Sequence, residues 1–436
     1  MLKDSRKIIS NAAWIIGCKI VKAILTLLVT MLTARYLGVA NYGLIDYARG
    51  IVAFVAPIMG LGLNSVAVHE IVNYPEAEGE TVGSIITMCL ASSLFCILGV
   101  FCFALLANSD EPITIAVCVI YGVTLIFQAI EMLQYWFQAK LLSKYSALAM
   151  LVSYIAVSII QTLLLIHHAD IRFFALSYSV DFLVIAIILV IVYGRIGKQK
   201  MTFSMKRSKE LLSVSKFYII SALMITIFNN TDRIMLKLMV GDTATGIYAA
   251  AHTCASMTSF IFVAIIDSMR GTIFESRNES ISKFEANMTG LYSVIIYFSL
   301  IQCFAVTILA PVIIRIMYGV TYVDSVSVLR IAVWFSTFSY LGTVRDIWLL
   351  SEGLQSLLWK INLSGAVMNV LLNSLLIPLW GPSGAAVTSV ISQLFTEVIT
   401  GFIIKRIRKN NMLMLAGANP STLKTIVNKV LRQNKR

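Results

Sequence analysis

The chain has 436 residues, of which 58% are hydrophobic and 13% charged, and its mean hydropathy is +0.84. In an ordinary soluble domain about 25% of the residues are charged. This composition therefore excludes such a domain. The net charge of +13 would suit a nucleic-acid-binding protein, but the placement of the basic residues indicates membrane topology instead.

Twelve long apolar stretches follow one another with short connections. About 20 apolar residues cross the hydrocarbon core of a bilayer as a helix, and lipid leaves the backbone no other hydrogen-bond partners. The sequence therefore predicts an all-α integral membrane protein with about 12 transmembrane helices and no soluble domain. The expected spans are 12–34, 44–72, 84–107, 113–137, 146–166, 171–194, 214–240, 247–268, 289–314, 327–350, 358–380 and 383–404.

The basic residues gather before the first span, in the loop 195–213 and in the tail 405–436. The connections near 108, 168 and 242 are poor in Lys and Arg. Since Lys and Arg mark the cytoplasmic side, we expect both termini and the loop 195–213 to be cytoplasmic. The basic tail is expected to meet anionic membrane lipids rather than nucleic acid.

The same loop is the predicted domain boundary. It separates an N-terminal six-helix lobe, 1–194, from a C-terminal six-helix lobe, 214–404, which the tail 405–436 follows. Each half contains a Gly-x-x-x-x-Gly turn after its first span, at 38–43 and at 241–246. Six helices per half would relate the lobes by an axis along the membrane normal.

Charged residues inside the predicted helices carry the functional signal. Each costs about 2.5–3.5 kcal/mol at the centre of a membrane helix on insertion scales, so such groups face the bundle interior or a cavity. Steps of three or four residues place them in polar stripes on the first and seventh helices. The stripes predict a central cavity whose cations suit an anionic ligand such as phosphate. The predicted cavity residues are Lys19, Lys22, Arg49, Arg233, Lys237 and Arg345.

The acidic residues and one histidine are candidates for ion coupling or for internal pairing: Asp46, Asp232, His252 and Asp267. Asp46 with Arg49, and Asp267 with Arg270, have the i,i+3 spacing that permits an ion pair. His252 could carry a coupling proton or serve only as a polar packing residue. Pro57, followed by Gly60 and Gly62, predicts a bend in the second helix, either static or a hinge.

Several motifs of catalysis are absent from the sequence. It contains no Gly-x-x-x-x-Gly-Lys-Ser/Thr phosphate loop, no Gly-x-Ser-x-Gly elbow and no cluster with metal-ligand spacing. We therefore expect no ATP hydrolysis, no metal, no cofactor and no enzymatic activity.

Three segments resemble the oligosaccharide flippase family, the Wzx-type polysaccharide exporters of the MATE-like superfamily. They are 33–43, 230–251 and 369–386, and the resemblance extends over roughly 8–408. It implies two six-helix lobes around a cavity. It also implies movement of an undecaprenyl-diphosphate-linked oligosaccharide from the inner to the outer leaflet of a bacterial cytoplasmic membrane, for O-antigen or capsule synthesis beside a polysaccharide polymerase. Asp232 matches the usual acidic position of the family in helix seven.

Two other functions compete with a flippase. A MATE-like drug or cation antiporter would place unpaired acids in the cavity. A membrane polysaccharide polymerase or ligase would need an active-site loop on the outer face, where the predicted connections are only a few residues long.

Overall fold

The computed structural model describes residues 2–424, apart from the side chains of 2–20, 23, 24, 65, 217 and 221. The described part consists of helices and contains no strand, which confirms the all-α class. The chain divides into two compact units, Met1–Leu238 and Met239–Arg436. This division falls later than the loop 195–213, so the assignment of lobes and linker remains a prediction.

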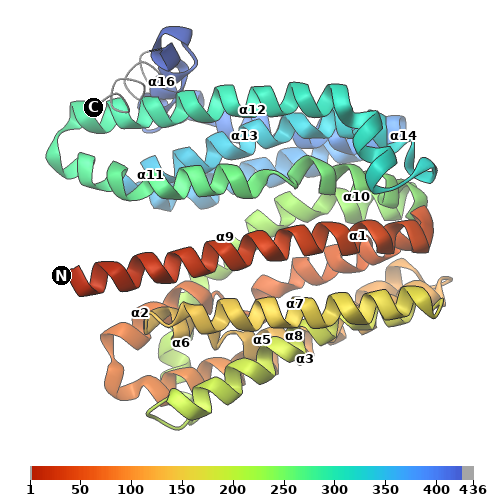
Figure 1. Ribbon diagram of the computed structural model, residues 1–436, viewed down its shortest axis with the longest axis horizontal. Coiled ribbons are helices and arrows are strands. Elements are labelled where there is room, and N and C mark those ends of the chain that lie inside the picture. Colours follow the sequence, from red (N-terminus) through yellow and green to blue (C-terminus); the bar gives the residue numbers. More distant parts are fainter. Residues whose placement is uncertain (1, 425–436) are drawn as a thin grey trace. The chain divides into compact units, whose positions relative to one another are not determined.

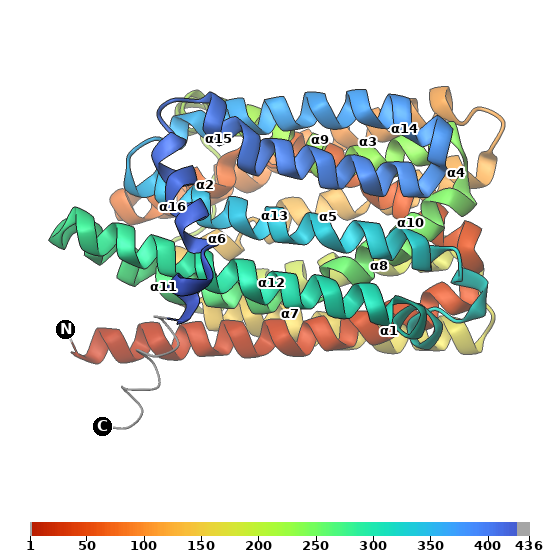
Figure 2. The ribbon, with the colours of Figure 1, turned by 90° about the horizontal axis from the view of Figure 1, so that it is seen from above.

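The first unit begins with α1, which is two helices joined at Gly38. The φ of 73° and ψ of 174° at Gly38 break the helix, and only glycine adopts them without strain. Figures 1 and 2 show the first part of α1, in red, running to this turn at one end of the unit. The helices of the first unit are α1 Leu2–Met59, α2 Leu63–Asn73, α3 Glu78–Ala107, α4 Pro112–Gly122, α5 Thr124–Glu131, α6 Gln134–Ala139, α7 Ser143–Ile166, α8 Ile171–Ile196 and α9 Met205–Met239.

The second unit contains a similar reversal. α14 turns back at Gly381, where φ is 54° and ψ is −130°, and Gly384 then lies against the backbone of Leu376 (Figure 2). A π-helical turn, Phe395–Ile399, follows α14. The helices of this unit are α10 Asp242–Ser256, α11 Ser259–Glu279, α12 Ile281–Met317, α13 Ser325–Ser351, α14 Leu358–Leu394, α15 Thr400–Ile403 and α16 Arg408–Gly417.

Eight helical stretches in the described residues are long and apolar enough to cross a membrane, or nine if the bent α9 is counted. The expected count of 12 differs from this number because α1 and α14 each contain two of the predicted spans. In addition, α13 is helical over the predicted span 327–350 but is too polar to be included. The predicted spans are therefore largely helical, although their count is not reproduced.

The first unit has two distinct ends. At one end the Tyr36 hydroxyl donates to the carbonyl of Ala169 over 3.2 Å, and the Tyr47 hydroxyl donates to Asn108 Oδ1 over 2.9 Å. The segment 197–204 lies at the opposite end (Figure 1). The connections near 108 and 168 are thus together, as the charge pattern predicted, and the basic loop is away from them.

The basic loop is docked on α3. The backbone N–H of Thr202 donates to the carbonyl of Gly79 over 3.2 Å, and that of Gly79 donates to Gln199 Oε1 over 2.8 Å. A Cβ at Gly79 or Gly83 would collide with the backbone of the loop, so both positions require glycine for this approach.

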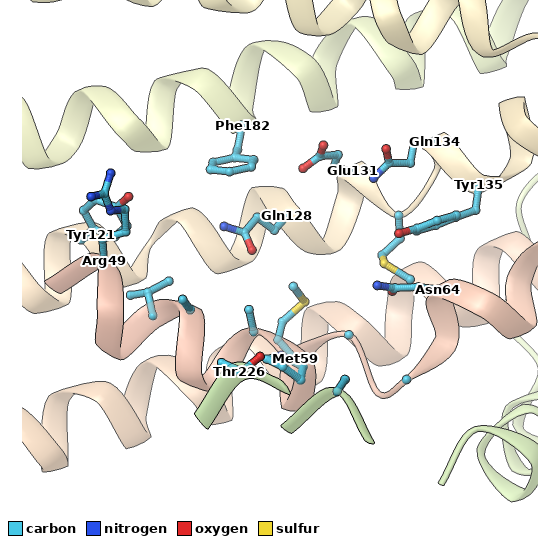
Figure 3. A pocket seen from close by; sticks show the side chains of 18 residues that line it. Arg49, Met59, Asn64, Tyr121, Gln128, Glu131, Gln134, Tyr135, Phe182 and Thr226 are labelled. Atoms are coloured by element: carbon cyan, nitrogen blue, oxygen red, sulfur yellow. The ribbon is translucent and has the colours of Figure 1, made fainter. Parts of the chain in front are cut away.

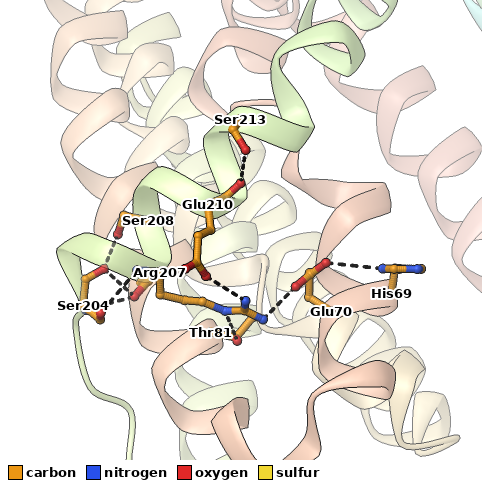
Figure 4. Close-up of polar contacts among 9 residues, drawn as sticks. His69, Glu70, Thr81, Ser204, Arg207, Ser208, Glu210 and Ser213 are labelled. Carbon is orange, nitrogen blue, oxygen red and sulfur yellow. Dashed lines mark hydrogen bonds and ion pairs between the residues drawn. The ribbon is translucent and has the colours of Figure 1, made fainter.

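Arg207 fixes the start of α9 at the same end of the unit (Figure 4). Its guanidinium lies 2.7 Å from Glu70 Oε2 on α2 and donates to Thr81 Oγ1 on α3 over 3.1 Å. Residues 199–207 are therefore part of the first unit's packing, whereas the lysines of this loop remain exposed.

Each unit has its own hydrophobic core. In the first unit Tyr47, Leu63 and Phe174 are completely or almost completely buried, and in the second Phe262 and Tyr292 are. Burial of such side chains stabilises each unit by about 1.5–3 kcal/mol per residue in water, but lipid-facing surfaces contribute differently because lipid is itself apolar.

Candidate functional site

One interrupted helix and one span with tight turns define the candidate site, which lies entirely in the first unit. α1 ends at Met59, and Leu61 and Gly62 have φ values of 50° and 63° before α2 begins. The predicted span 113–137 lies in a single stretch, Pro112–Ala139, in which turns at 123 and at 132–133 with helical φ and ψ separate α4, α5 and α6. Non-helical backbone at membrane depth is tolerated where it is buried in protein or lines a cavity.

The interruption between α1 and α2 and the turns between α4, α5 and α6 border a cavity of about 530 Å³ (Figure 3). Its size lies within the range of about 300–1,000 Å³ that is typical of small-molecule sites. α1, α2, α4, α5, α6, α8 and α9 all contribute residues to its wall. The polar side chains that line it are Arg49, Asn64, Tyr121, Gln128, Glu131, Gln134, Tyr135 and Thr226.

A buried ion cluster adjoins the cavity at Arg49. Asp46 is 0% exposed and hydrogen-bonds to the guanidinium of Arg49, which confirms the pairing predicted from their spacing. The second oxygen of Asp46 lies 3.1 Å from Arg233 Nε, and the two groups form an ion pair. Two guanidinium groups therefore share one buried carboxylate, and this cluster joins α1 to α9.

α1 and α9 lie close together at Gly50. A Cβ at Gly50 would lie 3.6 Å from the Cβ of Arg233, in ordinary contact. Arg233 also donates to Asn230 Oδ1 over 3.3 Å. Arg233 is therefore held within the helix interface, and it does not line the cavity that Arg49 lines.

Lys237 lies one helical turn further along α9, at the end of the unit. Its Nζ donates to Glu111 Oε2 over 2.6 Å, and Thr114 Oγ1 donates to the same carboxylate over 2.6 Å. The hydrogen bond from Lys237 is the main cause of a lowered pKa of Glu111, followed by the one from Thr114. Lys237 is thus bound to a carboxylate between α3 and α4 rather than presented to the cavity.

The remaining cations predicted for the cavity are not brought together in it. The side chain of Lys19 lies outside the described residues, and Lys22 Nζ lies 5.4 Å from the centre of the Tyr154 ring, as in a cation–π contact. Arg345 belongs to the second unit, where it is buried and pairs with Glu397 at 2.6 Å and Asp346 at 2.9 Å.

The coupling candidates also occupy different environments. Asp232 is buried in the first unit. In the second unit the His252 ring stacks on Phe335 with centroids 5.2 Å apart, and Asp267 pairs with Arg270 at 3.0 Å, which confirms the predicted i,i+3 pair. Their role in coupling remains a prediction.

The sequence analysis missed the polar residues that line the cavity together with Arg49. Gln128, Glu131 and Tyr135 follow one another at steps of three and four residues, which is the spacing of one helix face. That pattern could have marked the site. Among the described residues the Glu131 carboxylate has no hydrogen bond and no ion pair within 4.0 Å, and the charges of Lys22 and Asp181 act on it from further away. Within the described residues, no three His, Cys, Asp or Glu side chains come together as metal ligands would.

Comparison with known proteins agrees with this architecture. Residues 8–269 match the family described as "Polysaccharide biosynthesis protein". The chain is 25% identical over 248 residues to the uncharacterized membrane protein MJ1068 of Methanocaldococcus jannaschii, a match covering 54% of this chain and 48% of that protein. The chain thus spans about half the length of this curated relative.

Two solved structures have a fold similar to that of this chain. The lipid II flippase MurJ in an inward closed conformation aligns with a TM-score of 0.73 and 15% identity, over 92% of this chain and 89% of that one. A multidrug resistance MATE family transporter of the MOP superfamily, in an inward-facing conformation, aligns with a TM-score of 0.67 and 16% identity. The alignment covers 88% of this chain and 94% of that one. The predicted MATE-like fold is therefore confirmed.

Proposed function

Because this chain belongs to the polysaccharide biosynthesis protein family, we propose that it is a transporter that flips a lipid-linked oligosaccharide across a membrane, and not an enzyme. Its fold is that of a lipid II flippase and of a MATE transporter, which supports this proposal. The observation that carries it is the polar cavity inside a multi-pass apolar helix bundle, bordered by the interruption between α1 and α2. Interrupted helices at membrane depth are typical of substrate sites in transporters.

The substrate of this proposal is an undecaprenyl-diphosphate-linked oligosaccharide, moved from the inner to the outer leaflet of a bacterial cytoplasmic membrane. In this proposal both termini of the chain are cytoplasmic, and the translocated oligosaccharide passes to a polysaccharide polymerase. The sequence carries no nucleotide-binding loop, so a substrate or ion gradient drives the movement. Such a gradient shifts the conformational equilibrium only through different affinities for the two states.

A vesicle assay tests the proposal. Purified protein is reconstituted with lipid-linked oligosaccharides from its native cells, and sugar exposure on the far leaflet is followed with and without a proton gradient. We expect protein-dependent translocation, reduced at least tenfold by Lys22→Ala and by Arg233→Ala at equal protein level. Lys283→Ala is the control, since Lys283 forms an exposed i,i+4 pair with Glu279. Normal translocation by both variants would exclude a role of these two cations in transport, and no translocation by the unaltered chain would exclude the function.

One observation favours a drug or cation antiporter as the second candidate. Glu131 places a carboxylate in the cavity wall, and an organic cation would pair with such a group. Two results together would support this candidate instead. The purified protein would bind ethidium, with binding abolished by Glu131→Gln, and it would translocate no oligosaccharide.

A further inference from the structure

The cavity of the first unit is lined by groups that both donate and accept hydrogen bonds. Asn64, Gln128 and Gln134 each carry an amide, and Tyr121 and Tyr135 each carry a hydroxyl. Figure 3 shows these groups distributed along the length of the cavity rather than gathered at one point. A ligand that satisfies them must itself carry several donors and acceptors along its length.

Glu131 adds an acceptor without a donor. Its carboxylate, Gln134 and the ring of Phe182 all line this cavity (Figure 3). An ionised carboxylate accepts hydrogen bonds from hydroxyl groups at roughly twice the strength of a neutral acceptor. The nearby aromatic ring offers an apolar face. The combination suits a molecule with hydroxyl groups on its edge and C–H groups on its face.

The same lining is unsuited to a diphosphate. Among the described residues that line the cavity, Arg49 is the one cation, and its guanidinium already bonds to the buried Asp46. A diphosphate would bring at least two further negative charges close to Glu131. Burial of charges without matching partners costs several kcal/mol per ion, so this cavity disfavours such a group.

We propose that the cavity of the first unit is a sugar subsite: it binds a pyranose ring of the oligosaccharide through Glu131 and the cavity amides, and the diphosphate binds elsewhere. The inference rests on the proposed function, because it takes the transported molecule as the ligand. It gives the cavity a role in selecting the sugar, and separates that role from the recognition of the lipid.

Protection of a thiol in the cavity tests the proposal. Ala56 is a small, half-buried residue of the cavity wall, so Ala56→Cys introduces a reporter while keeping every polar lining group. The full chain is placed in nanodiscs and labelled with methyl methanethiosulfonate, and the labelled peptide is quantified by mass spectrometry. Two probes are compared: the phosphate-free glycan that mild acid releases from native lipid-linked oligosaccharides, and undecaprenyl diphosphate without sugar.

We expect the glycan to slow labelling of the cysteine at least fivefold. Undecaprenyl diphosphate should leave the labelling rate unchanged. Adding Glu131→Gln should raise the glycan concentration needed for half protection about tenfold, since the bond to a charged acceptor is lost. Glu76→Gln is the matched control, because Glu76 is exposed in the same unit outside the cavity.

The outcomes separate the two proposals. Equal protection by undecaprenyl diphosphate, or glycan protection that Glu131→Gln leaves unchanged, would overturn the sugar subsite. Binding of intact lipid-linked oligosaccharide is measured in parallel by native mass spectrometry. If the intact molecule binds while its glycan gives no protection, the sugar subsite fails and the flippase function stands. If neither binds, the function itself fails.

Discussion

At the scale of single residues, Asp46 has the greatest effect on the electrostatics of the first unit. It is completely buried and contacts the guanidinium groups of both Arg49 and Arg233, so it contributes to the charge balance of each. Removing one member of a buried ion pair leaves an uncompensated charge, which is much more costly than losing an exposed pair.

We expect Asp46→Asn to destabilise the protein by about 3–5 kcal/mol, because the guanidinium groups of Arg49 and Arg233 would lose a completely buried counter-ion. Thermal unfolding of the purified protein in detergent measures this effect. Glu279→Gln, which breaks the exposed pair with Lys283, should cost no more than about 1 kcal/mol. Equal melting temperatures for both variants would show that the Asp46 cluster does not stabilise the unit.

A second prediction concerns acid pH. Lys237 lowers the pKa of Glu111 in the folded protein, so their pair adds stability above the ordinary glutamate pKa of about 4.3. That stability is lost as pH falls through the lowered value. Because the Glu111 side chain is 46% exposed, the contribution is below about 1 kcal/mol. The difference in melting temperature between the unaltered protein and Glu111→Gln should be positive at pH 7 and shrink towards pH 3. A constant difference would contradict the pairing.

At the scale of helices, the break between α1 and α2 meets a bend in α9. α9 bends by 53° near residue 217. A Cβ on Gly62 would lie 2.8 Å from both the Ile219 nitrogen and the Ser215 carbonyl oxygen. The two irregular segments therefore touch through a glycine. The bend predicted from Pro57 is thus a complete interruption, which begins just after that proline.

Substitution of the two glycines should have unequal effects. Gly62→Ala combines a φ of 63° with a collision against α9, so we expect a loss of about 1–3 kcal/mol. Gly60→Ala meets its nearest atoms at 3.5 Å and should change stability by less than about 1 kcal/mol. Unfolding of both variants in the same detergent measures the contrast, and similar losses would mean that the contact with α9 is unimportant.

The helices themselves could be predicted from the sequence much better than their interruptions. Runs of apolar residues are sufficient to place membrane spans, and Pro57 with its glycines marked one break. Gly122 ends α4 beside the turn at 123, whereas the segment 124–133 contains neither Pro nor Gly, so nothing local announced the turn between α5 and α6. Helical spacing also identified the pair of Asp46 and Arg49. Arg233 comes from a distant part of the chain, and its contact with Asp46 depends on tertiary packing that spacing does not encode.

At the scale of the whole molecule, the orientation in the membrane is testable through opposite ends of the first unit. Lys206 and Asp110 are both exposed; Asp110 follows the connection at Asn108, and Lys206 adjoins Arg207 at the start of α9. Lys206→Cys should resist an impermeant maleimide in intact cells, whereas Asp110→Cys should react, because Lys and Arg mark the cytoplasmic side. Lysed cells provide the control in which both react. The reverse pattern would invert the proposed topology.

The division of the chain after Leu238 has a consequence for engineering. Each unit keeps its own core, and the covalent link between α9 and α10 is only Val240–Gly241. Gly241 adopts a φ of 115° and has no atom within 4 Å of a would-be Cβ. The chain can therefore be divided at this junction. Inserting a fluorescent reporter there would leave the hydrophobic core of each unit intact, and so would translating the two units as separate fragments.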